Sequence, residues 1–80
     1  MLFEIKSKAS ASDIYEAVGQ LQIYDRLLGG GWRRVLVIPK GLAAPLKGPI
    51  SALGILTVEF ERRGGQIRFN SDALTDCLSA

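Results

Sequence analysis

Residues 2–39 read LFEIKSKASASDIYEAVGQLQIYDRLLGGGWRRVLVIP, and this stretch decides the fold. Residues 2–8 begin by alternating between two faces, the period of a β-strand. The apolar positions of residues 14–28 follow the spacing of an amphipathic helix, which the glycine run at 29–31 ends. Residues 33–38, RRVLVI, finish in consecutive apolar side chains, a run that is typical of a strand buried on both faces.

A strand, a helix and a second strand joined by short connections predict a βαβ unit. Its two strands should be parallel and its crossover right-handed. We expect the helix to begin near Asp13, because Asp13 and Glu16 have the spacing of a capping box. Both carboxylates would then lie near the positive end of the helix.

The second half of the chain predicts shorter elements. Residues 40–47 contain glycine and proline and are expected to form a loop, and residues 48–53 a short helix with a proline in its first turn. Residues 56–61 and 66–70 flank a turn with two glycines and predict a β-hairpin. A last helical turn is expected within residues 71–78. The predicted fold class is therefore α/β, a small βαβ-based mixed sheet with a C-terminal β-hairpin.

The composition is that of one small globular domain covering residues 1–80. Hydrophobic residues make up 48% and charged residues 22% of the chain. A chain of this length buries a small core, so association with a partner or with a second copy is expected. The net charge of +2 is compatible with nucleic acid without requiring it. For the doublets Arg33–Arg34 and Arg62–Arg63, solvated strand ends and a turn are favoured over phosphate contacts.

Several kinds of site are excluded by the residues that the chain lacks. It has no histidine, which rules out histidine-based zinc sites and serine–histidine or cysteine–histidine pairs. The lone Cys77 cannot form an internal disulfide and is expected to fill apolar space. A metal would need oxygen ligands, which points to Mg²⁺, Mn²⁺ or Ca²⁺. No apolar run is long enough for a membrane span and charges interrupt the first residues, so a cytoplasmic location is expected.

The first strand carries the strongest candidate for chemistry. Glu4 and Lys6 share one face of the strand, about 6.5–7 Å apart along it. The Glu4 carboxylate is a hard ligand for a divalent metal, and the backbone carbonyl of Ile5 between them could add a second oxygen. Lys6 could stabilise charge on a phosphate oxygen or help to position and deprotonate a water molecule. The alternative is an exposed ion pair worth about 0–1 kcal/mol.

The order of these features resembles a known family. A strand reading hydrophobic-Glu-hydrophobic-Lys, a serine-rich loop and a helix containing AVGQLQIY are similar to the core of the PD-(D/E)XK nuclease superfamily, which has the restriction-endonuclease-like fold. The matching residues are Glu4, Lys6, Gln20 and Tyr24, and the following strand RRVLVIP also matches. Gln20 and Tyr24 are four apart and share a helix face. The resemblance covers residues 2–39.

The resemblance implies a nuclease that hydrolyses phosphodiester bonds with Mg²⁺ or Mn²⁺, on DNA rather than RNA. Glu4 would bind the metal and act in catalysis with Lys6, and Gln20 and Tyr24 would orient the site or contact the nucleic acid. The family's first acidic residue belongs to a preceding strand, for which the 80 residues leave no room. The resemblance is therefore to the C-terminal half of such a domain, and a composite active site is expected.

Two alternatives remain open. The chain could be a catalytically inactive nuclease-like remnant that associates with itself or binds nucleic acid or protein. It could also be an ordinary small α/β domain whose motif is coincidental. A homodimer is expected under either nuclease-related reading, because the strand at residues 2–8 would have an unpaired edge and twofold dimers are the commonest homo-oligomers.

Overall fold

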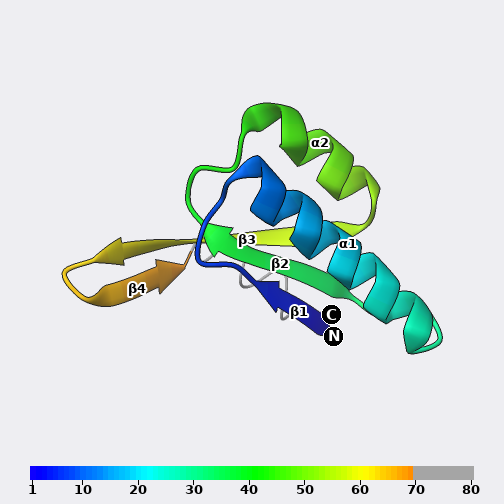
Figure 1. The fold of residues 1–80 in the computed structure, drawn as a ribbon. Coiled ribbons are helices and arrows are strands. Elements are labelled where there is room, and N and C mark those ends of the chain that lie inside the picture. Colours follow the sequence, from blue (N-terminus) through cyan, green and yellow to red (C-terminus); the bar gives the residue numbers. More distant parts are fainter. Residues whose placement is uncertain (70–80) are drawn as a thin grey trace.

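The computed structural model describes residues 1–69, which form a curled four-stranded mixed sheet with two helices (Figure 1). The elements are β1 (Leu2–Ile5), α1 (Ala11–Leu27), β2 (Arg34–Pro39), α2 (Ala44–Ala52), β3 (Ile55–Arg63) and β4 (Gln66–Phe69). The predicted α/β class, mixed sheet and hairpin are confirmed. The helical turn expected at residues 71–78 lies outside the described residues.

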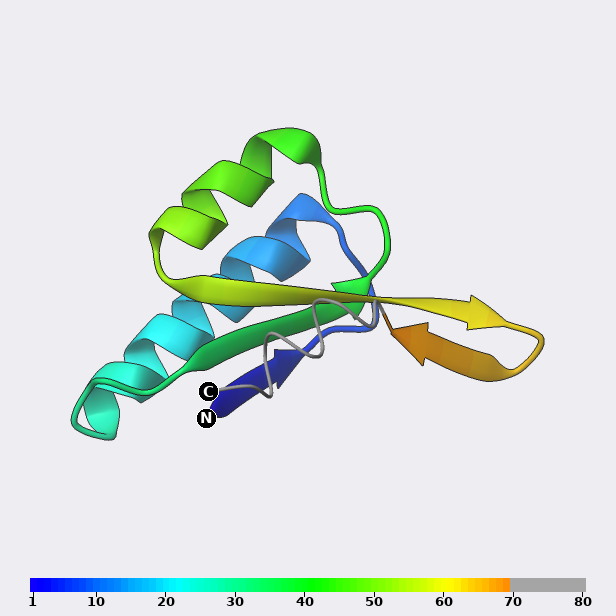
Figure 2. The ribbon, with the colours of Figure 1, turned by 180° about the vertical axis from the view of Figure 1, so that it is seen from behind.

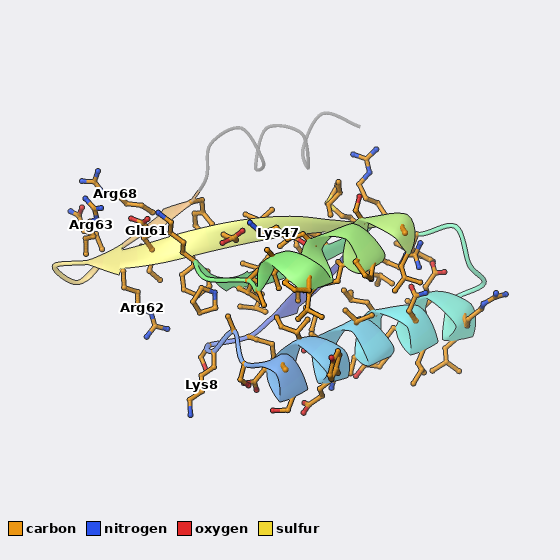
Figure 3. All side chains as sticks on the ribbon, turned by 90° about the horizontal axis from the view of Figure 1, so that it is seen from above. Lys8, Lys47, Glu61, Arg62, Arg63 and Arg68 are labelled. Atoms are coloured by element: carbon orange, nitrogen blue, oxygen red, sulfur yellow. The ribbon has the colours of Figure 1, made fainter. Side chains whose placement is uncertain are left out.

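The sheet has the order β1-β2-β3-β4, with β1, β2 and β3 parallel and β4 antiparallel to β3. Each parallel connection runs through a helix, and both connections step in the same direction across the sheet. Crossovers of one hand then place both helices on one face, and Figure 3 shows α1 and α2 on the same side of the strands. Within residues 1–69, neither helix is long and apolar enough to cross a membrane.

The central strand β2 is buried on both faces, as predicted. Leu36 and Ile38 face the helices and pack with α1 and α2. Val35 and Val37 face the opposite way and join a second cluster with β3. The helix-facing core comprises Ile14, Ala17, Leu21, Leu36, Ile38, Leu42, Ile50 and Ile55.

Helix α1 begins earlier than predicted. Its N-cap is Ser10, whose Oγ accepts a hydrogen bond from the Asp13 N–H at 3.4 Å, so Asp13 lies in the first turn. A serine at this position satisfies one of the unpaired N–H groups of the helix start. The glycines after Leu28 end the helix with positive φ angles, and Asp25 then accepts the Trp32 N–H at 2.8 Å as the chain turns back toward β2.

The expected loop at residues 40–47 was partly wrong, because α2 already begins at Ala44. Pro45 occupies the first turn of this helix, where a missing N–H costs nothing. Pro49, expected in the first turn, instead lies inside the helix. Pro49 has no backbone N–H to donate within the helix, and the neighbouring Ile50 is buried in the core.

The β3–β4 hairpin extends beyond the rest of the sheet (Figures 1 and 2). Pairing of β2 with β3 ends where Pro39 meets Phe60, whereas β3 pairs with β4 from Phe60 opposite Phe69 onward to the turn. The turn residues, Gly64 and Gly65, have φ angles of 54° and 80°. Two consecutive positive φ angles are what a tight hairpin turn requires, and glycine adopts them without strain.

We predict that Leu36→Ala destabilises the protein by about 2–5 kcal/mol, because it removes a fully buried side chain and leaves a cavity. The free energy of unfolding from urea denaturation measures the loss. Leu56→Ala is the matched control, since Leu56 on β3 is partly exposed and should cost clearly less. Equal losses at the two positions would contradict the assignment of the core.

Candidate active site at the edge strand

Side chains of β1 alternate between two faces, as predicted. The face that carries Glu4 and Lys6 is covered and the apolar face is exposed, which is the reverse of what an exposed Glu–Lys pair requires. Glu4 is opposite Leu36, so it faces the helices. The side chains of Glu4 and Lys6 are only 19% and 16% exposed. Phe3 and Ile5, on the other face, are 50% and 68% exposed. The polar pair therefore lies between β1 and the helix layer.

Lys6 connects the strand to helix α1. Its Nζ lies 2.7 Å from Glu16 Oε1 and 3.7 Å from Glu4 Oε1. The hydrogen bond to Glu16, with a smaller contribution from Glu4, raises the pKa of Lys6 above its ordinary value. Lys6 is thus a firmly held cation at neutral pH, suited to stabilising negative charge rather than to removing a proton from water.

From the spacing along helix and strand, we expect Gln20 at about the level of Glu4. Helix α1 returns antiparallel to β1, and the contact between Lys6 and Glu16 sets the register. One helical turn onward, about 6 Å, is Gln20, and two strand residues back, about 6.6 Å, is Glu4. Tyr24 follows one turn further along the helix.

The Oε1 atom of Gln20 is buried and has no hydrogen-bond partner within residues 1–69. A buried acceptor without a donor is costly, so this oxygen is a candidate contact for a bound group. Tyr24 is half-exposed at the rim. We call Glu4, Lys6, Glu16 and Gln20 the polar seam.

Glu4, Lys6 and Gln20 are candidates from the sequence, whereas for Glu16 the sequence predicts only a place at the start of the helix. The sequence could have identified Glu16 as a member of the site, because it lies one helical turn before Gln20.

The backbone of β1 presents further polar groups at the outer edge of the sheet. Leu2 N–H donates to the Arg33 carbonyl at 2.7 Å, and Lys6 N–H donates to the Val37 carbonyl at 3.0 Å. Because peptide groups alternate in direction along a strand, the N–H and carbonyl of Ile5 point away from β2. Within residues 1–69, no strand pairs with that edge.

The polar seam supplies only part of a metal site. Glu4 and the Ile5 carbonyl are hard oxygen donors of the kind that Mg²⁺ prefers, but such an ion takes about six oxygens. Among the described residues there is no group of three or more acidic, histidine or cysteine side chains that could hold a metal. A metal therefore fits here only with donors from outside this part of the chain.

Comparisons of the chain with protein-family models, curated proteins and solved structures returned no match. The relation of residues 2–39 to PD-(D/E)XK nucleases therefore stays a prediction.

We predict that Glu16→Gln lowers the pKa of Lys6 toward the ordinary lysine value, because it removes the largest cause of the raised pKa. The pairing favours the protonated form, so its stabilising effect is present at neutral pH and is lost as pH rises through the pKa of Lys6 in the folded protein. Titration of lysine ¹³Cε signals by NMR measures the change. Lys40, whose pKa is raised by Glu61, should be unaffected, and an unchanged Lys6 titration would contradict the pairing.

Proposed function

We propose that this protein is part of a Mg²⁺- or Mn²⁺-dependent nuclease of the PD-(D/E)XK type, acting in the cytoplasm on phosphodiester bonds of DNA. The observation that carries the proposal is the placement of Glu4 and Lys6. They project from one face of an edge strand with 3.7 Å between Nζ and Oε1, and the facing helix carries Gln20, one turn after the Lys6 partner Glu16. The proposal also rests on the order of the same residues in the sequence.

Each residue of the polar seam has a defined part in this function. Glu4, with the Ile5 carbonyl, would hold the divalent ion, which when bound supplies Lewis-acid polarisation of a phosphate oxygen. Lys6 is close enough to Glu4 to place its positive charge beside the same phosphate. Gln20 offers a buried acceptor that orients a bound donor such as a water molecule. Glu16 holds the Lys6 side chain in place.

The proposed active site is composite. The further carboxylate that a metal site needs would come across the outer edge of β1, from another polypeptide or from a second copy of the chain. That edge is suited to the purpose, because strand edges with free N–H and carbonyl groups recruit other strands. The Ile5 carbonyl points toward it, so donors from both sides could meet at one ion.

We predict Mn²⁺-dependent cleavage of single- or double-stranded DNA by the wild type. Lys6→Ala should lower the cleavage rate about 10²- to 10³-fold, the usual effect of removing one group that stabilises charge in the transition state. The two proteins are purified in parallel, so that a contaminating nuclease appears equally in both.

Mn²⁺ binding, followed by electron paramagnetic resonance, locates the site. Glu4→Gln should weaken binding, whereas Glu59→Gln, the same change on β3, should not. Equal binding by these two variants together with equal cleavage by wild type and Lys6→Ala would refute the proposed nuclease function.

A second candidate function is a non-catalytic, self-associating module. It is favoured by the exposure of Phe3 and Ile5, two large apolar side chains on the face of β1 turned away from the helices. Burying these side chains against a second copy would remove apolar surface from water beside the same strand edge.

We predict that the wild type sediments as a dimer and that Ile5→Lys shifts it toward monomer, because a charge would be buried at the contact. Analytical ultracentrifugation measures the shift. Ile23→Lys, at an exposed position of α1, is the control and should leave the dimer intact. A dimer without metal-dependent cleavage would favour the non-catalytic module, and a monomeric wild type would exclude self-association through β1.

A further inference from the structure

Positive charge is concentrated on the β3–β4 hairpin and on the residues beside it. Five cations lie on or beside the hairpin and two carboxylates lie among them, a net charge of +3 in a chain whose total is +2. Among the other residues within 1–69, five cations stand against four carboxylates, a net charge of +1. The cations are Lys40, Lys47, Arg62, Arg63 and Arg68, and the carboxylates are Glu59 and Glu61.

Two of these arginines are available to a partner. Glu61 is already engaged on both oxygens, with Lys40 Nζ at 2.8 Å and Arg63 Nε at 3.2 Å. Arg62 and Arg68 are exposed and form no ion pair within residues 1–69. The Arg62 guanidinium lies 5.8 Å from the centre of the Phe60 ring, which supports the side chain without neutralising it.

The available cations lie on opposite sides of the hairpin. Side chains alternate along β3, so Arg62 points away from Arg63, and Figure 3 shows Arg62 on one side of the ribbon with Arg63 and Arg68 on the other. Arg68 also lines a recess with Lys40 and Lys47, which extends the basic surface toward α2, although Glu59 and Glu61 line the same recess.

We propose that the hairpin beyond Phe60 is a nucleic-acid-binding element that enters a groove of duplex DNA and contacts phosphates on both sides. The inference deepens the proposed function, on which it rests for the class of partner. A two-stranded ribbon fits the major groove of B-form DNA, about 12 Å wide. Arginine matches phosphate because its planar fork donates two hydrogen bonds to adjacent oxygens.

The same geometry disfavours a membrane surface as the partner. A lipid surface is contacted by one face of an element, and cations directed to the opposite face would contribute little to binding. The walls of a DNA groove, in contrast, present phosphates on both sides. The hairpin also projects as two strands past the end of β2, so both of its faces are accessible to a groove.

The test is the salt dependence of binding to a fluorescein-labelled 20-base-pair DNA duplex, followed by anisotropy without divalent metal so that cleavage is absent. The double variant Arg62→Gln/Arg68→Gln should reduce the slope of log K against log salt by about 2, since each phosphate contact contributes about 0.9. Arg62→Lys/Arg68→Lys retains both charges and should keep most of the slope.

Arg26→Gln is the matched control for each single variant, Arg62→Gln and Arg68→Gln. Arg26 lies in the last turn of α1, at the far end of the molecule from the hairpin (Figure 1). It should leave the slope unchanged, and thermal melting confirms that each variant remains folded.

The outcomes separate this inference from the proposed nuclease activity. Hairpin-dependent binding by a chain that does not cleave supports the DNA-binding element while the nuclease function fails. Absence of duplex binding, or binding that Arg26→Gln weakens as much as the hairpin variants do, overturns the inference whether or not the chain cleaves. Stronger hairpin-dependent binding to phosphatidylserine vesicles than to the duplex at equal salt also overturns it.

Discussion

The burial of β2 on both faces is the constraint on which the rest of the structure depends. Leu36 and Ile38 are covered by the helices, whereas Val35 and Val37 pack with Val58 and Phe60 of β3 on the opposite face. The parallel neighbours of β2 require helical crossovers. Because both crossovers step the same way, α1 and α2 cover one face and β1 becomes an edge. The location of the polar seam follows directly, since β1 turns Glu4 and Lys6 toward α1.

Charged groups in such a position need compensation. Lys6 and Glu4 are largely covered, and removal from water would be costly if they were not paired with each other and with Glu16. The pairing also connects the first strand to the first helix, so one set of contacts supports the fold and holds the candidate site. Gln20 is the exception, because its buried oxygen has no partner among the described residues.

The polar seam and the basic hairpin lie toward opposite edges of the sheet, at β1 and at β3–β4. In the proposed nuclease, the site that acts on a phosphate, at β1, would therefore be separate from the hairpin that binds the neighbouring duplex. The division has a physical basis. Lys6 is held by Glu16 and Glu4, as suits the role proposed for it, whereas Arg62 and Arg68 form no ion pair within residues 1–69, as suits the proposed contacts with phosphates.

The sequence by itself determined the elements that depend on local pattern. The period of residues 2–5, the helical spacing up to Leu28 and the Gly64–Gly65 turn each predicted what the structure contains, because backbone geometry dictates those periods. Alternation along β1 also placed Glu4 and Lys6 on one face. It could not say which face would be covered, since that depends on where the crossovers place the helices.

Only the tertiary structure decided the remaining features. Helix α2 begins at Ala44, because Pro45 is suited to a first helical turn and the helix packs on the core through Ile50. Glu16 became the partner of Lys6 through the packing of α1 on β1. The hairpin became a projecting two-stranded ribbon because β2 ends at Pro39. Contacts between residues distant in the sequence set all of these, and a local pattern carries no information about them.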